Sequence, residues 1–125
     1  MKILVVEDDL NLRRIVSLNL RKRDYLVVEA SNGRQALTLV ADELPDLILL
    51  DLAIPSLSGW KVLTAIKRPH HLRKIPVIIM TASAAETERE RALGMGAASY
   101  LVKPFGVATL MQEVTQQLAR RQSDE

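Results

Sequence analysis

The sequence predicts an α/β fold in which a parallel sheet is covered by helices on both faces. Five short apolar runs alternate with five stretches of helical periodicity along the 125 residues. Strands that alternate with helices are typical of a parallel sheet, because each crossover helix returns the chain to the end where the next strand begins. Runs without a polar interruption, such as Leu47 to Leu50, indicate strands that are buried on both faces.

The first half of the chain contains three of the predicted strands. Residues 2–6 (KILVV) form the first, residues 25–28 (YLVV) the second and residues 47–50 (LILL) the third. Apolar residues at helical spacing follow the first two strands: Leu12, Ile15, Val16 and Leu20 after the first, and Ala36, Leu37 and Val40 after the second. These patterns predict two amphipathic helices, and Asn32-Gly33 marks the turn into the second helix.

The second half contains the remaining two strands, at residues 77–80 (VIIM) and 100–102. Two further helices are predicted from their apolar positions. These positions are Val62, Leu63 and Ile66 in the third helix, and Leu110, Met111, Val114 and Leu118 in the last, which spans about Val107 to Arg121. Ser83 and Glu86 have capping-box spacing for the fourth helix, which Gly94 and Gly96 end. We therefore expect one domain over residues 1–121 and a frayed tail over residues 122–125.

Composition excludes several classes of protein. The chain has no cysteine, so disulfides and thiolate metal sites are excluded. It has no apolar run of about 18 residues and no signal peptide, which predicts a cytoplasmic protein with no membrane segment. The 17 basic and 15 acidic residues are nearly balanced and scattered, and aromatic residues make up only 3%. Direct binding of nucleic acid is therefore not expected.

Polar residues end four of the five predicted strands. Glu7 and Asp8 follow the first strand, Asp51 the third, Thr81 the fourth and Lys103 the fifth. In open parallel sheets, ligands bind outside the carboxyl ends of the strands. If the first and third strands are neighbours, three carboxylates and one lysine share a crevice with a formal charge of −2. Oxygen ligands of this kind suit Mg²⁺, which retains several waters and associates with phosphoryl groups.

This set of side chains can support phosphoryl transfer to a carboxylate. Asp51, already ionised, would be the nucleophile, while Mg²⁺ and Lys103 would neutralise phosphoryl charge and Thr81 would donate a hydrogen bond. Taken singly, each residue also has a structural explanation. Asp8 or Asp9 could cap the first helix, Asp51 could serve a turn, and Thr81 and Lys103 could be ordinary strand-end residues. The four complementary strand ends together favour the chemical interpretation.

The motifs ILVVEDD, LILLDLAIPSLSG, VIIMTA and YLVKPF, in this order, resemble the receiver domain of response regulators in two-component signalling. The resemblance runs from Lys2 to about Leu118. It implies a (βα)5 flavodoxin-like fold with strand order 2-1-3-4-5. It also implies that Asp51 is the phosphoacceptor, which becomes an aspartyl phosphate by transfer from a sensor histidine kinase or a phosphotransfer protein.

The resemblance also implies a role for each residue of the site. Asp8 would bind Mg²⁺ directly, Glu7 through water, and the Ala53 backbone carbonyl would complete the protein ligands with Asp51. Thr81 and Lys103 would contact the phosphoryl group, and Ala82 would leave it room. Tyr100 would be an aromatic switch that rotates inward as Thr81 moves. The Lys103-Pro104 bond is expected to be cis.

The same resemblance implies two partner surfaces. A kinase would dock near the first helix, and a downstream protein would bind the face formed by the fourth helix, the fifth strand and the last helix. Receiver domains of winged-helix transcription factors carry acidic residues before the switch aromatic, whereas this chain has Ala98-Ser99. We therefore expect a monomer or a phosphorylation-dependent dimer that does not rely on that charged interface.

Three alternatives remain open at this stage. The chain could be the N-terminal receiver domain of a longer regulator, since LARRQ fits the start of a linker. It could be a Mg²⁺-dependent phosphatase acting through an aspartyl phosphate, but such enzymes place a general acid where Ala53 stands. It could be a flavodoxin-like cofactor binder, but EDDLN is acidic where a phosphate-binding loop should be. The favoured function is a phosphoacceptor module that turns over no external substrate.

Overall fold

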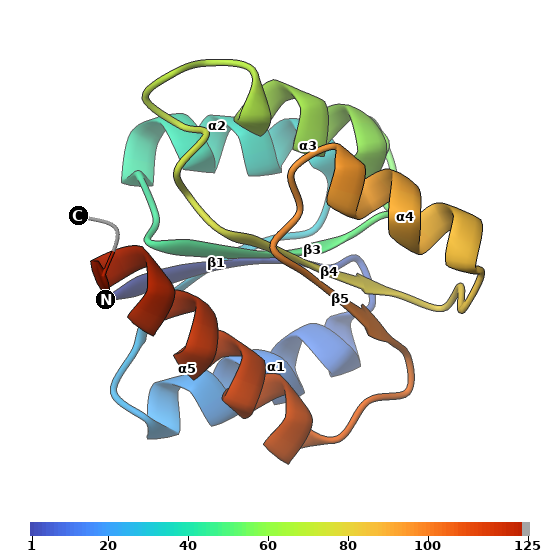
Figure 1. The fold of residues 1–125 in the computed structure, drawn as a ribbon. Coiled ribbons are helices and arrows are strands. Elements are labelled where there is room, and N and C mark those ends of the chain that lie inside the picture. The colour runs from blue at the N-terminus through green and yellow to red at the C-terminus, as the bar shows by residue number, and fades with distance from the viewer. Residues whose placement is uncertain (124–125) are drawn as a thin grey trace.

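The computed structural model describes residues 1–123, in which five strands and five helices alternate along the chain (Figure 1). The elements are β1 (Lys2–Val6), α1 (Leu10–Lys22), β2 (Leu26–Ala30), α2 (Gly33–Glu43), β3 (Leu47–Asp51), α3 (Gly59–Lys67), β4 (Val77–Thr81), α4 (Glu86–Gly94), β5 (Ser99–Val102) and α5 (Val107–Ser123). None of the helices within residues 1–123 has the length and apolar character needed to cross a membrane.

The five strands form one parallel sheet of order β2-β1-β3-β4-β5, which confirms the predicted topology. Helices α2, α3 and α4 cover one face of the sheet, and α1 and α5 cover the other (Figure 1). The chain moves outward from β1 to β2 and then crosses back to β3 on the other side of β1. The carboxyl ends of β1 and β3 therefore border the switch point, where sheets of this type bind ligands.

The central strand β3 separates two hydrophobic clusters. Ile48 and Leu50 pack with residues of α2 and α3, while Leu47 and Leu49 pack with residues of α1 and α5. All four side chains are fully buried, which explains why the strand has no polar position before Asp51. Burial of each contributes roughly 1.5–3 kcal/mol. This packing fixes the backbone that presents Asp51 at the edge of the sheet.

Local capping groups determine where the first helices begin. The Asp9 carboxylate accepts hydrogen bonds from the amides of Asn11 (2.9 Å) and Leu12 (3.2 Å), so Asp9 and not Asp8 caps α1. Asn32 caps α2 by accepting from the Gln35 amide at 2.8 Å. Each cap satisfies amide groups that the first helical turn leaves without partners. Asp8 is thereby left available for the site.

Gly59 allows α3 to begin close to the end of β3. Its amide donates to the Leu52 carbonyl at 3.0 Å. A Cβ atom at this position would lie 2.4 Å from the Leu52 Cα and 2.6 Å from the Asp51 carbonyl oxygen, far inside van der Waals contact. A side chain would therefore push α3 away from the strand end that carries Asp51.

Several local predictions were wrong. Ile15 was expected to be buried but is 52% exposed, because the buried stripe of α1 runs through Val16, Ser17 and Leu20. Strand β2 begins one residue later than predicted and extends to Ala30. The Ser83–Glu86 capping box does not form: α4 begins at Glu86, after Ala85, and the Ser83 hydroxyl accepts instead from the Ala85 amide at 3.3 Å.

The end of the chain also differs from the prediction. Helix α5 continues to Ser123, two residues beyond the predicted end at Arg121. Of the tail predicted to fray, residues 122 and 123 are thus helical, and residues 124–125 lie outside the described part of the chain.

Candidate functional site

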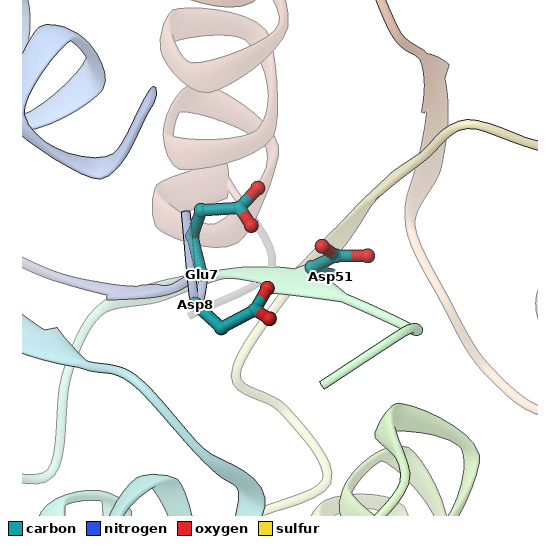
Figure 2. A group of neighbouring side chains, drawn as sticks. All are labelled: Glu7, Asp8 and Asp51. Atoms are coloured by element: carbon teal, nitrogen blue, oxygen red, sulfur yellow. The ribbon is translucent and has the colours of Figure 1, made fainter. Parts of the chain in front are cut away.

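Three carboxylates meet at the carboxyl edge of the sheet. Glu7 and Asp8 follow β1, and Asp51 ends β3, which pairs directly with β1. One carboxylate oxygen from each lies within 4.8 Å of the others (Figure 2). Glu7 and Asp51 are only 1% and 4% exposed, whereas Asp8 is exposed. The prediction that the ends of the first and third strands converge is therefore met by the fold.

Lys103 connects two of these carboxylates. Its ammonium nitrogen lies 2.5 Å from Glu7 Oε1 and 2.9 Å from Asp51 Oδ2. Lys103 follows β5, which is separated from β3 by β4, so its side chain reaches past the end of β4 to Asp51. The Lys103-Pro104 peptide bond is cis, as predicted. One ammonium group thus pairs with two of the three carboxylates, and the cluster keeps the excess of negative charge expected from the sequence.

Burial and charge shift the ionisation of this cluster. Burial raises the pKa of Glu7 to about 7, and the neighbouring Asp51 adds to the rise although Lys103 opposes it. Burial alone would lower the pKa of Lys103, but its hydrogen bonds to Glu7 and Asp51 outweigh that and keep the pKa above its usual value. Lys103 therefore remains a cation at neutral pH, while Glu7 is easily protonated unless another cation joins the cluster.

Asp51 opens into a cavity of about 350 Å³. The cavity is lined by residues from the ends of β3, β4 and β5 and from α3 and α4: Asp51, Leu52, Ala53, Trp60, Thr81, Ala82, Ser83, Glu88 and Lys103. The Ala53 amide donates to Asp51 Oδ1 at 3.0 Å, and Lys103 binds the other oxygen, so the carboxylate has a fixed orientation. Thr81, the predicted hydroxyl donor, lines the same cavity and is 6% exposed.

Tyr100 lies inward, with 6% of its surface exposed. Its hydroxyl donates to the Ser83 carbonyl at 2.9 Å, and the Ser83 amide donates to Thr81 Oγ1 at 3.4 Å. Burial raises the pKa of Tyr100, so the phenol keeps its proton and its ability to donate. Ser83 thereby connects the two predicted switch residues.

The contact between Arg91 and Trp60, near the cavity, was not predicted from the sequence. The Arg91 guanidinium of α4 lies 4.0 Å from the centre of the Trp60 ring, which lines the cavity from α3. A guanidinium over an indole is a favourable cation–π contact. The position of Trp60 directly after Gly59 was the one sequence feature that indicated a place near the site. Nothing in the sequence pattern connects Trp60 to Arg91.

The donor set fits a divalent cation. Three carboxylates with one lysine leave uncompensated negative charge, and two of the carboxylates are buried. Hard cations with oxygen ligands neutralise such clusters, and Mg²⁺ in particular uses one or two carboxylates and retains water. Since Asp8 is exposed, the cluster is open to solvent on one side.

The sheet order and the acidic cleft beside its switch point define a doubly wound α/β protein with a candidate ligand site at the ends of β1 and β3. Comparison with known sequences narrows this class. Residues 3–115 match the response regulator receiver domain family, and the chain belongs to that family.

Individual relatives agree with this assignment. A probable transcriptional regulator, ycf27, of Guillardia theta is 35% identical over 119 residues, which are 95% of this chain and 46% of that protein. The chain thus spans about half the length of the curated relatives it matches. The receiver domain of a putative LuxO repressor from Vibrio parahaemolyticus superposes with a TM-score of 0.90 at 29% identity, covering 98% of this chain and 93% of that one.

A third relative holds a metal ion. The receiver domain of the sensor histidine kinase PA1611 from Pseudomonas aeruginosa PAO1 has a TM-score of 0.86 and 31% identity, over 94% of this chain and 97% of that one. Its crystal structure has a magnesium ion coordinated in the active site cleft.

Proposed function

We propose that Asp51 is the phosphoacceptor of this receiver domain and becomes an aspartyl phosphate. The observation that carries the proposal is the fixed Asp51 carboxylate, 2.9 Å from the Lys103 ammonium at the base of a cavity of about 350 Å³. A phosphoryl donor with a phosphohistidine, on a sensor histidine kinase or a phosphotransfer protein, would supply the group.

The transfer needs no general base, because the nucleophile is an ionised carboxylate. An oxygen of Asp51 attacks phosphorus and forms an O–P bond, while the P–N bond of the phosphohistidine breaks. The electron pair of that bond returns to the imidazole nitrogen of the donor. Lys103 stabilises the negative charge on the phosphoryl oxygens, and the Thr81 hydroxyl, on the same cavity wall, donates a hydrogen bond to one of them.

Asp8, Asp51, Glu7 through a water molecule, and the Ala53 carbonyl would hold a Mg²⁺ ion. When bound, the ion supplies positive charge beside the transferring phosphoryl group. The charge excess of the three carboxylates and the magnesium in the cleft of the PA1611 receiver domain support this assignment.

Thr81 and Tyr100 would report phosphorylation to a downstream protein. Both are connected to Ser83, so a movement of Thr81 toward the phosphoryl group would act on the hydrogen bond of Tyr100. The affected surface is the face formed by α4, β5 and α5. On this face Ala98-Ser99 stands where the winged-helix regulators carry acidic residues, which supports a monomer or a phosphorylation-dependent dimer without their charged interface.

The phosphoryl donor would dock beside α1. Ile15 and Leu18 are 52% and 54% exposed on this helix. A cavity of about 420 Å³ lies between α1 and the segment after β5, lined by Asp9, Leu12, Lys103, Pro104 and Phe105. Leu12, Pro104 and Phe105 share this cavity with Lys103, so a partner bound here could bring a phosphohistidine to Asp51.

The domain would act in the cytoplasm and would turn over no external substrate, since Ala53 stands where a phosphatase needs a general acid. Its extent would be residues 1–121. A second possibility is that it is the N-terminal receiver domain of a longer regulator with its own output domain. The observation favouring this is that ycf27 of Guillardia theta is about twice as long as the match.

Incubation with acetyl phosphate and Mg²⁺, followed by intact-protein mass spectrometry, tests the assignment. We expect one base-labile phosphate on the wild-type chain and none on Asp51→Asn. Asp42→Asn, a change of the same type on the exposed surface of α2, should be labelled like the wild type. Equal labelling of Asp51→Asn and Asp42→Asn would refute Asp51 as the phosphoacceptor.

A further inference from the structure

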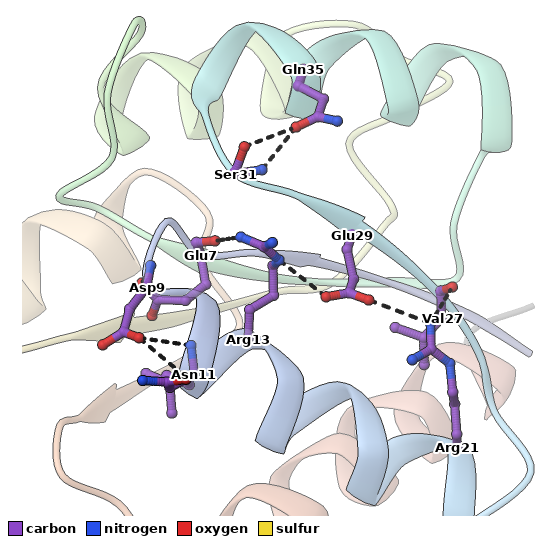
Figure 3. Close-up of polar contacts among 10 residues, drawn as sticks. Glu7, Asp9, Asn11, Arg13, Arg21, Val27, Glu29, Ser31 and Gln35 are labelled. Carbon is purple, nitrogen blue, oxygen red and sulfur yellow. Dashed lines mark hydrogen bonds and ion pairs between the residues drawn. The ribbon is translucent and has the colours of Figure 1, made fainter.

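Arg13 of α1 contacts the backbone of the acidic cluster. Its Nη1 group donates to the main-chain carbonyl of Glu7 at 2.9 Å, and its Nε group donates to Glu29 Oε1 at 3.0 Å (Figure 3). The Arg13 side chain is only 17% exposed. The guanidinium thus lies between the turn that follows β1 and the end of β2.

Glu7 is held by contacts at each of its polar groups. Its amide donates to the Ala30 carbonyl at 3.0 Å, and its carboxylate binds the Lys103 ammonium and accepts from the Asp9 amide at 3.2 Å. Within residues 1–123, the side chain of Arg13 is the group that holds its main-chain carbonyl. That carbonyl belongs to the Glu7–Asp8 peptide, so its orientation also determines the position of the Asp8 backbone.

Glu29 orients the guanidinium. It stands on β2 opposite Val5 of β1, one residue before the Ala30 carbonyl that binds Glu7. It accepts from Arg13 and also lies 3.5 Å from the Arg21 guanidinium of the same helix (Figure 3). The end of β2 is the one strand end to which the sequence assigned no candidate residue, but through Arg13 it reaches the site.

We propose that Arg13, oriented by Glu29, is a positioning residue that fixes the Glu7–Asp8 turn so that both carboxylates converge on Asp51. The inference rests on the proposed metal site. Mg²⁺ accepts oxygen ligands only in near-octahedral positions, so a small rotation of this peptide moves the oxygens of Glu7 and Asp8 out of place. Groups that orient metal ligands from outside the coordination sphere typically change metal affinity by about 10–100-fold.

Titration calorimetry with MgCl₂ tests this role. Arg13→Met keeps most of the aliphatic packing and removes both hydrogen bonds, and we expect it to weaken Mg²⁺ binding by about tenfold or more. Arg14→Met, at the exposed neighbouring position, removes the same charge without either bond and should stay within about twofold of the wild type. Equal affinities of the two variants would overturn the proposal.

A double-mutant cycle separates positioning from general destabilisation. Glu29→Gln alone should weaken Mg²⁺ binding several-fold, because the guanidinium loses its orienting carboxylate. Added to Arg13→Met it should change nothing further, since Glu29 acts through Arg13. Additive effects of the two substitutions would contradict the proposed route. Should Arg13→Met fail to fold, Arg13→Lys and Glu29→Gln provide the same comparison.

Nuclear magnetic resonance of the metal-free protein gives a readout that is independent of Mg²⁺. Arg13→Met loses the hydrogen bond to the Glu7 carbonyl, which should shift the Asp8 amide resonance. Arg14→Met keeps that bond, so the resonance should not move. An unshifted Asp8 amide in Arg13→Met would overturn the inference. Failure of the wild-type chain to bind Mg²⁺ in a manner abolished by Asp8→Asn would instead refute the metal site, and with it the role of Arg13.

Discussion

The two ends of the sheet differ in how their charged side chains are paired. At the amino ends of the strands, Lys2 lies 2.7 Å from Glu43, and Arg121 lies 3.4 Å from Asp46. At the carboxyl ends, three carboxylates lie together, Lys103 pairs with only two of them, and those two, Glu7 and Asp51, are almost fully buried. Opposite charges at the first end are matched one to one and serve the fold. At the second end negative charge is concentrated, which costs stability but creates a site for a cation and a phosphoryl group.

Packing shows the same contrast, and a pair of glycine substitutions should reveal it with the largest effect. Gly59→Ala should destabilise the protein by about 3 kcal/mol, because the new Cβ atom meets the backbone of Leu52 and Asp51. Gly94→Ala, at the other end, has no neighbouring atom within 4 Å and should be neutral or about 0.5 kcal/mol more stable. Urea unfolding measures both. Similar losses in the two variants would break the comparison.

The next effect concerns pH. The pKa of Glu7 is about 7 in the folded protein and 4.5 in the unfolded chain, so the folded state binds more protons between these values. In the absence of metal, the free energy of unfolding should therefore decrease by about 2 kcal/mol as the pH rises from about 5 to about 8. Glu7→Gln should remove this decline. Urea unfolding in EDTA at both pH values provides the measurement, and a decline that persists in Glu7→Gln would assign it to another group.

A smaller effect is expected at the amino ends. Arg121→Ala removes hydrogen bonds from the guanidinium to the Asp46 carbonyl (2.6 Å) and carboxylate (3.4 Å). The contact is partly exposed, so the loss of stability should be about 1 kcal/mol. Mg²⁺ affinity should not change, because this end lies across the sheet from the cleft. A change in calorimetric Mg²⁺ affinity would show that the two ends are coupled.

The smallest effect is expected for Arg91→Ala. It removes the guanidinium from the Trp60 ring at the rim of the cavity and should cost about 0.5 kcal/mol. Trp60 is the single tryptophan of the chain, so its fluorescence reports this contact directly. We expect a change in emission in Arg91→Ala and none in Arg89→Ala, which lies two residues earlier on α4 and is also exposed. Unchanged emission in Arg91→Ala would refute the stacking contact.

Much of the site could be predicted from the sequence because strand ends are marked by abrupt changes in polarity. Leu47–Leu50 are apolar and Asp51 is not, so the position of the acid relative to the sheet follows from the pattern alone. The same reasoning located Glu7, Asp8, Thr81 and Lys103. Once the strand order was assigned, their proximity required no knowledge of side-chain packing.

The contacts between helices and strands could not be predicted in this way. Whether Arg13 meets Glu29 depends on the rotation of α1 about its axis, and the apolar spacing predicted that rotation imperfectly, since Ile15 is exposed and Ser17 is buried. It also depends on the register of β2, and the sequence placed the start of that strand one residue too early. The stack of Arg91 on Trp60 likewise depends on how α3 and α4 pack.

Asp46 brings two distant parts of the chain to one place. Its carboxylate accepts from the Lys2 amide at 2.7 Å, and its carbonyl accepts from Arg121 at 2.6 Å. A short peptide could therefore join the region of Lys2 to the region of Arg121, and the chain could be reopened between His70 and His71, which are both exposed. Such a circular permutant would keep the sheet order and the cleft. Moving the chain ends to this exposed loop would therefore leave the spatial arrangement of the domain unchanged.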